Sequence, residues 1–567
     1  MKLILTLLCV FGPALQLAAG ESVSTASASG ANPAAANVEA MPAGADHRKS
    51  AAVVTADDLN QLRERIVRQE EEIKRLQQSI EEQRSFLERA VANSNGGPAF
   101  VSASSGASGG PVKLIPAVNV AHPNITGSGR TGQKTAENPS PLSINIGNTT
   151  FTPLGFIDFT WYGRSTNVGS GIGTSFGGIP YNSSAMGHIS ENNFSTQNSR
   201  IGFRVDSTVL GAKVLGYVEA DFLGNAAANV FVTSNSNTFR MRNFFVDVQK
   251  GGLEMLGGQD WTLFTPNRKG LSPIPGDIFY SQNMDTNYQA GLIWARQSQF
   301  RLIAHPNQNV AFGVSLENPQ QYVGNGIVTF PASLSTGTSG EFNNTTTTYS
   351  VPNLHPDIIF KAAYDGHAGD KILHVEAGAL IRSFKFVNAV GKNPTSYVSS
   401  TATAASGEVN ANLELVKNVR LIANTFFGSG GGRYIFGLGP DVVVRADGSI
   451  SPVHAYSTVD GFEANISKNT LISMLYGGAY FGRNTAVDGD GTPIGYGFAG
   501  SATNNNRTVQ EATFDLVQTF WKNPAYGALS LIAQYSYMWR SPWSIPSSGT
   551  RYAKTNMIWL DLRYTLP

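Results

Sequence analysis

The chain has 567 residues, and its 41 Lys and Arg nearly balance its 40 Asp and Glu, so net charge gives no case for nucleic-acid binding. Charged residues make up only 14% of the chain, aromatic residues reach 10%, and 60 residues are glycine. After residue 20, no stretch approaches the roughly 18 consecutive apolar positions of a transmembrane helix. This composition favours a transmembrane β-barrel.

Residues 1–20, MKLILTLLCVFGPALQLAAG, predict a secretory signal peptide. Lys2 precedes an apolar stretch, and Ala18-Ala19-Gly20 supplies the small residues of a cleavage site. A buried N-terminal helix is the alternative. Because the only cysteine, Cys9, lies in this leader, disulfide and thiolate chemistry are excluded from the mature chain. Residues 21–55 are rich in Ala and Ser and are predicted to be disordered.

Residues 56–90 carry apolar side chains at spacings of three and four, with Glu, Arg and Gln between them, which predicts an α-helical coiled coil. Two polar d positions lower its stability but can fix its register. A single solvated helix is the alternative, and the heptads leave the number of associating chains open. The predicted oligomerisation seam consists of Leu59, Leu62, Ile66, Gln69, Ile73, Leu76, Ile80, Gln83 and Leu87. Residues 91–150 are predicted to be a Gly/Ser/Pro-rich linker.

From residue 151 to residue 567, short segments alternate apolar and polar side chains and end at turn residues. In GFIDFTWY, for example, Ile157 and Phe159 share one face and Asp158 and Thr160 share the other. A period of two with charge on one side predicts a strand with one face in lipid and one in water. Residues 239–248, FRMRNFFVDV, keep this period only in their first half.

Seven short connections interleave with eight long ones, which predicts an all-β fold: a 16-stranded antiparallel transmembrane β-barrel. A propeller or an array of soluble sandwiches is the alternative, but no repeat of about 40–50 residues appears. The last segment, NMIWLDLRYTLP, is expected to pair with the first strand, so that no sheet edge faces lipid. The long connections are predicted at residues 163–198, 224–237, 265–288, 319–356, 387–406, 428–453, 482–507 and 541–553.

Four arginines on the second and fourth predicted strands share the polar face. An Arg that faces lipid at mid-depth costs about 2–4 kcal/mol, so these side chains are expected to face the lumen. They either form a cationic ladder that attracts carboxylates, or pair with Asp206, Glu219 or Asp221 and neutralise the wall. The four arginines are Arg200, Arg204, Arg240 and Arg242.

The long connection after the fifth predicted strand, TPNRKGLSPIPGDIFYSQNMDTN, is expected to fold into the lumen, because its Pro and Gly residues suit a bent path. An external solvent loop is the alternative. The charges of this connection include Asp285. Because selectivity depends on side chains at the narrowest point, the predicted channel-lining residues are Arg200, Arg204, Arg240, Arg242, Arg268, Lys269, Asp277 and Arg382.

Other motifs point to no chemistry. GTSFG at 173–177 matches the nucleophile-elbow pattern but lies in a Gly/Ser-rich stretch without a strand-to-helix context. The eight His are scattered without metal-ligand spacing. The sequence therefore predicts no catalytic residue, no metal site and no cofactor.

The chain resembles the DcaP-like trimeric outer-membrane porins. The resemblance rests on SRIGF at 199–203, GGQDWTLF at 257–264, RQSQFRL at 296–302 and ENP at 317–319, in that order, and on a final strand that ends RYTLP. It implies a homotrimer in the outer membrane of a Gram-negative-type bacterium, with a helical N-terminal stalk in the periplasm. It also implies diffusion of small anionic solutes, with dicarboxylates as the suggested class. A structural tether that links the membrane to the cell wall through the coiled coil, or a barrel enzyme, is the alternative.

Overall fold

The computed structural model describes residue 74 and residues 140–224, 237–279, 283–332, 334, 341–343, 353–390, 396–545 and 549–567. The predicted signal peptide, the segment 21–55 and every seam residue of the predicted coiled coil lie outside the described residues and stay predictions. Among the described residues, no helix is both long and apolar enough to cross a membrane.

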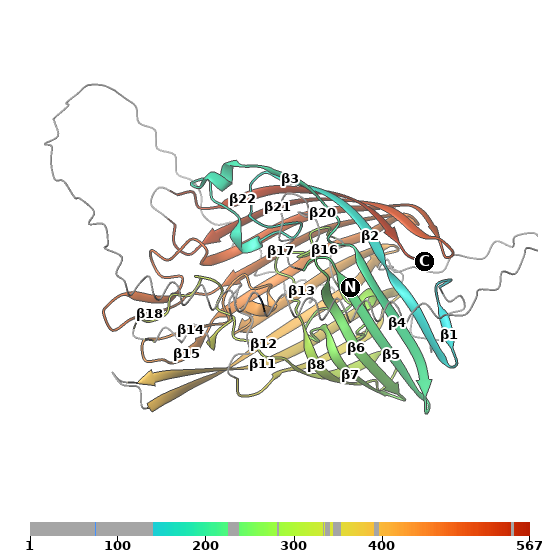
Figure 1. The fold of residues 1–567 in the computed structure, drawn as a ribbon, viewed down its shortest axis with the longest axis horizontal. Coiled ribbons are helices and arrows are strands. Elements are labelled where there is room, and N and C mark those ends of the chain that lie inside the picture. The colour runs from blue at the N-terminus through green and yellow to red at the C-terminus, as the bar shows by residue number, and fades with distance from the viewer. Residues whose placement is uncertain are drawn as a thin grey trace, which may run out of the picture. The chain divides into compact units, whose positions relative to one another are not determined.

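Sixteen antiparallel strands form one closed barrel (Figure 1), which confirms the predicted strand number. Two further short strands, β1 (Ile144–Ile146) and β3 (Glu191–Ser195), pair with β2 beside the barrel wall. The barrel strands are β2 (Thr149–Arg164), β4 (Arg200–Val209), β5 (Ala212–Asp221), β6 (Arg240–Lys250), β7 (Leu253–Trp261), β8 (Arg296–Ala304), β9 (Val310–Glu317), β10 (Asp357–Ala368), β11 (Lys371–Val390), β12 (Ser396–Val416), β13 (Val419–Ser429), β16 (His454–Ser467), β17 (Thr470–Phe481), β20 (Asn506–Asn523), β21 (Gly527–Pro542) and β22 (Ala553–Thr565).

The barrel closes on β2. The second half of β2 pairs with the last strand, β22, from Phe156 opposite Thr565 to Arg164 opposite Met557. Its first half pairs with β4. The predicted pairing of the last strand with the first is therefore confirmed. β1 and the start of β2 lie in the stretch that the sequence analysis assigned to the linker.

Short turns and long loops alternate around the barrel, as the sequence predicts. One long connection differs: residues 387–406 were expected to be a loop, but β11 runs to Val390 and β12 begins at Ser396. This hairpin reaches past the neighbouring strands (Figure 1), because its Ser, Thr and Ala side chains continue the cross-strand register. The long loops contain η3 (Phe176–Gly178), η4 (Ala185–His188), η5 (Pro275–Asp277), η7 (Gly432–Tyr434), and the hairpins β14 (Val442–Val444) with β15 (Ile450–Pro452) and β18 (Asn484–Val487) with β19 (Pro493–Tyr496).

The two faces of the wall differ in the way the alternation predicts. On β2, Ile157 and Phe159 are 64% and 51% exposed on the outer face, whereas Asp158 and Thr160 are buried on the inner face. Large apolar side chains are exposed along the outer faces of the other barrel strands as well. An apolar outer belt is the surface that a barrel presents to lipid.

A bulge in β6 explains why the period of two breaks in residues 239–248. Glu219 of β5 pairs with Asn243, and the next β5 residue pairs with Met241, so Arg242 has no opposite residue. Arg242 and Asn243 are consequently both buried inside the barrel. An extra residue in one strand shifts the side-chain pattern in this way.

The loop between β7 and β8 packs closely against the inner surface of β17, and a glycine substitution tests this packing. A Cβ on Gly477 would overlap the Ala290 carbonyl oxygen, whereas a Cβ on Gly257 of β7 would meet nothing within 4 Å. We expect Gly477→Ala to destabilise the protein by about 1–3 kcal/mol, the usual cost of overpacking. Gly257→Ala should change stability by less than about 0.5 kcal/mol. Thermal unfolding in detergent measures the difference, and equal midpoints would contradict this packing.

Candidate solute pathway

Three arginines and two carboxylates interlock on the inner face of β4, β5 and β6. Arg240 binds Asp221 through two parallel bonds of 3.0 and 2.7 Å. Arg242 donates to Glu219 at 2.6 Å and to Asp221 at 2.8 Å. Arg200 reaches Glu219 at 3.5 Å. Charge-assisted bonds of this kind fix both partners in orientation.

Arg204 lies on the same inner face of β4 and pairs with Asp206 two residues along, at 2.6 Å. Each of the four arginines that the sequence places in the lumen therefore has a carboxylate partner. The side-chain geometry is that of the pairing alternative rather than of an unpaired ladder. Exposure is nevertheless uneven: the Arg240 side chain is 39% exposed, whereas that of its partner Asp221 is fully buried.

A fourth cation, Arg296, lies beside this group and was not identified from the sequence. The Arg296 guanidinium lies 5.4 Å from the Trp261 ring centroid and 5.7 Å from that of Trp294. Within the described residues, Arg296 Nη1 and Trp294 Nε1 are buried and have no hydrogen-bond partner. The alternation of β8 places Arg296 on the face of the outward Ser298, which is why the polar-face rule does not select it. We call Arg200, Arg240, Arg242 and Arg296 the arginine cluster.

Three aromatic side chains, those of Tyr288, Trp261 and Trp294, connect the arginine cluster to the loop inside the barrel. Tyr288, from the long loop after β7, accepts a hydrogen bond from Arg242 at 3.0 Å. Its ring lies 5.7 Å from Trp261 and 5.3 Å from Trp294. The same buried cluster includes Ile422 of β13 and Val459 of β16. The contacts therefore reach from the wall of β6 and β7 to the wall on the other side.

The loop between β7 and β8, residues 262–295, folds into the barrel as predicted. Arg268 makes two 2.7 Å bonds to Glu463 of β16. The Asn267 amide donates to Glu376 of β11 at 2.9 Å. The Arg268 amide also donates to the Asp277 carbonyl at 2.6 Å, which folds the loop back on itself. Of the predicted loop charges, Arg268 is buried, and Lys269 and Asp277 are half-buried.

The second half of this loop contacts the opposite wall. The Asp285 amide donates to Gln534 of β21 at 3.1 Å, and the Ala290 amide donates to Glu511 of β20 at 2.9 Å. Asp285 itself is buried and accepts a 3.1 Å bond from the Thr174 amide. Burial raises the pKa of the Asp285 carboxyl, although the Arg164 charge acts in the other direction. The loop therefore crosses the lumen and is held at both ends.

A cluster of charged side chains on β10, β11 and β12 of the barrel wall holds the crossing loop in place. Lys361 lies 2.8 Å from Glu376 and 3.0 Å from Glu408, and all three side chains are fully buried. Its ammonium also donates to the Thr265 carbonyl of the loop at 2.8 Å. His374 of β11 contacts Asp365 of β10 at 2.8 Å. Buried charges of this kind hold a loop in one position because each needs its partner.

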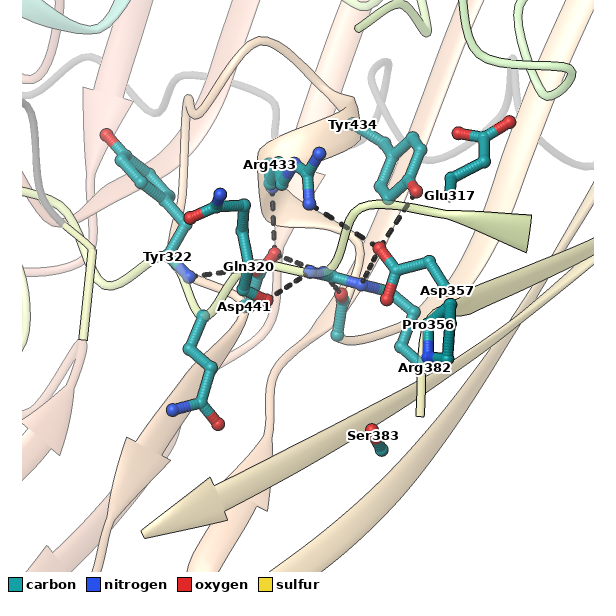
Figure 2. A network of polar contacts seen from close by, with 12 residues as sticks. Glu317, Gln320, Tyr322, Pro356, Asp357, Arg382, Ser383, Arg433, Tyr434 and Asp441 are labelled. Carbon is teal, nitrogen blue, oxygen red and sulfur yellow. Dashed lines mark hydrogen bonds and ion pairs between the residues drawn. The ribbon is translucent and has the colours of Figure 1, made fainter. Parts of the chain in front are cut away.

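Arg382 occupies the centre of a second network, where it lies between two carboxylates (Figure 2). It binds Asp357 at 3.1 Å and Asp441 at 2.9 Å. Asp357 also accepts from the Tyr434 hydroxyl at 2.9 Å, and Asp441 accepts from the Tyr322 amide at 2.9 Å. Arg382 faces inward, and its charge fixes Gln320 of the loop after β9 and Asp441 of the loop after β13 against the wall.

Apolar side chains from the long loops pack inside the end of the barrel that carries those loops. They form one buried cluster with inward aromatic residues of the wall. The sequence predicts these segments as long connections and does not predict this packing. The loop residues of the cluster include Ile172, Phe176, Ile179, Val323, Ile435, Leu438, Val442, Val443, Val444 and Tyr496, and the wall residues include Phe384, Phe386, Phe426 and Phe481.

Arg268 and Arg204 allow a matched test of loop anchoring. The Glu463 partner of Arg268 is fully buried, whereas the Arg204–Asp206 pair is 28% and 41% exposed. Arg268→Ala leaves a buried charge without its main partner, so we expect a loss of about 3–5 kcal/mol. Arg204→Ala should cost at most about 1 kcal/mol.

Thermal unfolding in detergent compares the two variants. Replacing Glu463 as well, in Arg268→Ala/Glu463→Ala, should restore part of the lost stability. Equal midpoints for the two single variants would contradict the anchoring role of Arg268.

A solved structure of an outer-membrane channel shares this fold. The outer membrane channel DcaP of Acinetobacter baumannii aligns with a TM-score of 0.54 at 17% identity, covering 74% of this chain and 98% of that chain. An anion-selective porin from Comamonas acidovorans aligns with a TM-score of 0.42 at 12% identity, over 74% of this chain and 99% of its own. OprB of Pseudomonas putida aligns with a TM-score of 0.39 at 13% identity, over 73% and 94%.

No protein-family model matches the chain, and no curated protein matches it in sequence. The structural likeness to DcaP nevertheless covers almost the whole of that channel. The resemblance that the sequence motifs indicate is therefore confirmed at the level of the fold: the chain shares its barrel fold with the DcaP outer-membrane channel.

Proposed function

We propose that this protein is an outer-membrane porin, a homotrimeric diffusion channel for small hydrophilic solutes that prefers anionic carboxylates and dicarboxylates. One observation carries the proposal: a closed barrel with an apolar outer belt has an inner wall of charged and polar side chains. A barrel of sixteen strands is wide enough to leave a lumen.

The arginine cluster supports the preference for anions. Its four guanidinium groups share two carboxylates, those of Glu219 and Asp221. The pairing therefore leaves an excess of positive charge at this part of the wall. Because Arg240 is the exposed member of its pair and Asp221 is buried, a solute at this wall meets a guanidinium first.

Carboxylates on the opposite wall do not cancel this preference. Glu511 accepts from the crossing loop through the Ala290 amide, and Asp515 accepts from Ser473 at 3.1 Å. Both carboxylates are buried. A carboxylate solute can instead bind a planar guanidinium through two parallel hydrogen bonds, an arrangement that a chloride ion cannot form.

Charge reversal in the arginine cluster tests the anion preference. We expect the wild-type protein to show an anionic reversal potential in a salt gradient across a planar bilayer. Arg240→Glu/Arg296→Glu should shift the permeability ratio towards cations by about fivefold, since a partly screened charge pair contributes on the order of 1 kcal/mol. Gradients of potassium chloride and of potassium succinate compare the two anion classes.

Lys468→Glu is the control for this experiment, because Lys468 lies at the short turn between β16 and β17, away from the arginine cluster. Its reversal potential should equal that of the wild type. A cation preference of the wild-type channel, or an unchanged ratio in the double variant, would refute the anion preference.

The coiled coil predicted for residues 56–90 is the proposed oligomerisation element. Its charges surround the apolar seam, so it suits the aqueous periplasm rather than lipid. Deletion of residues 56–90 should leave conducting barrels but weaken the trimer in gel filtration and native mass spectrometry. Deletion of residues 21–55 removes a segment of the same length without heptads and should leave the trimer intact. A stable trimer without residues 56–90 would exclude this role.

A further inference from the structure

Two arginines share one indole ring at the long-loop rim of the barrel. Arg483, just after β17, lies 4.4 Å from the Trp543 ring centroid, and Arg507, at the start of β20, lies 5.2 Å from it. Trp543 follows β21 and donates through Nε1 to the Phe481 carbonyl at 3.0 Å. Both arginines are exposed, so the indole positions two cations at the surface.

An aromatic belt lies beside these arginines on the outer face. Tyr480 of β17 is 38% exposed and packs edge-on against Trp543 at 6.0 Å. Trp539 of β21 lies 6.4 Å from Tyr476 and 5.5 Å from Tyr537. Aromatic girdles of outer-membrane barrels lie at the level of the lipid headgroups, and long loops lie on the extracellular side. The belt therefore places Arg483 and Arg507 at the headgroups of the outer leaflet.

A second pair of cations lies at the start of the next strand, β22, on the same rim. Arg551 lies 5.6 Å from the Tyr552 ring and Lys554 lies 6.0 Å from it. Lys554 is opposite Trp539 in the pairing of β21 with β22, which joins the two pairs into one surface. We call Arg483, Arg507, Arg551 and Lys554, with Trp543 and Tyr552, the rim patch.

The rim patch has an excess of positive charge. Within the described part of the chain, none of its four cations forms an ion pair. Two acids of neighbouring segments, Asp488 after β18 and Asp460 of β16, have other partners: Asp488 accepts from the Ala332 amide at 2.6 Å, and Asp460 accepts from Thr458 at 2.6 Å. The undescribed segments between residues 225 and 548 contain no Asp or Glu.

We propose that the rim patch binds the phosphorylated headgroup of an outer-leaflet glycolipid of the lipopolysaccharide class. Guanidinium groups match phosphate oxygens through paired, charge-assisted hydrogen bonds. The patch lies on the outside of the barrel beside the aromatic belt, which selects a lipid rather than a soluble phosphate in the lumen. The inference rests on the outer-membrane location in the proposed function and does not depend on conduction.

Native mass spectrometry of the full chain in detergent, titrated with bisphosphorylated lipid A, tests the proposal. Arg483→Gln/Arg507→Gln should weaken binding by about tenfold or more, because each cation near an anionic membrane surface contributes on the order of 1 kcal/mol. Arg483→Lys/Arg507→Lys keeps the charge but loses the paired hydrogen bonds, so its affinity should lie between those of the wild type and the glutamine variant. Lys417→Gln/Lys468→Gln removes the same charge at the opposite rim and should bind as the wild type does.

Two further probes identify the ligand chemistry. Dephosphorylated lipid A should bind at least about tenfold more weakly than the phosphorylated form, and inorganic phosphate alone should not compete at equal concentration. Unchanged binding by the glutamine variant would overturn the proposal. So would equal affinity for dephosphorylated lipid A, or competition by inorganic phosphate. Reversal potentials and unfolding midpoints equal to those of the wild type show that the variants fold and that the channel is separate from this site.

Discussion

The rest of the structure depends on the closure of the sheet at β2. Backbone N–H and C=O groups have no water partner in the hydrocarbon region, so a β-structure can span it only as a closed barrel. β2 meets this constraint by pairing with β22 over one half and with β4 over the other. The same register decides which side chains face the lumen. A slip of one residue would turn Asp158 and Thr160 towards lipid and Ile157 towards the lumen.

Closure leaves an interior that the long loops occupy, and buried charges fix where they lie. Arg268 joins the crossing loop to Glu463, Lys361 joins it to the β10 wall, and Arg382 holds two other loops through Asp441 and the Gln320 carbonyl. A buried ion pair adds little net stability, because removing two charges from water offsets their attraction. Breaking one is costly, however, so these pairs select one arrangement of the loops. Apolar side chains of the long loops are also buried, and this burial supplies the stabilisation that the ion pairs do not.

The local alternation of apolar and polar residues was enough to predict the strands of the barrel wall. It was not enough to predict how the loops pack inside the barrel. The alternation along β2 and β11 depends on residues two apart, so it correctly places Asp158 and Arg382 inside. The β6 bulge depends on the partner strand, and it alone brings Arg242 and its neighbour inward together. The role of Arg268 depends on Glu463, which is 195 residues away. Contacts of that range leave no period in the sequence, which is why the apolar loop packing was missed.

The exposed part of the arginine cluster decides which charge a solute meets at this wall. The Arg240 side chain is 39% exposed, whereas that of Arg242 is 2% exposed. A carboxylate at this wall can bind the Arg240 guanidinium through paired hydrogen bonds, and a cation or a neutral apolar solute cannot. Because the crossing loop holds Tyr288 against Arg242, the cluster is oriented before a solute arrives. Under the proposed function, this arrangement favours a channel that selects carboxylates over one that admits all small solutes equally.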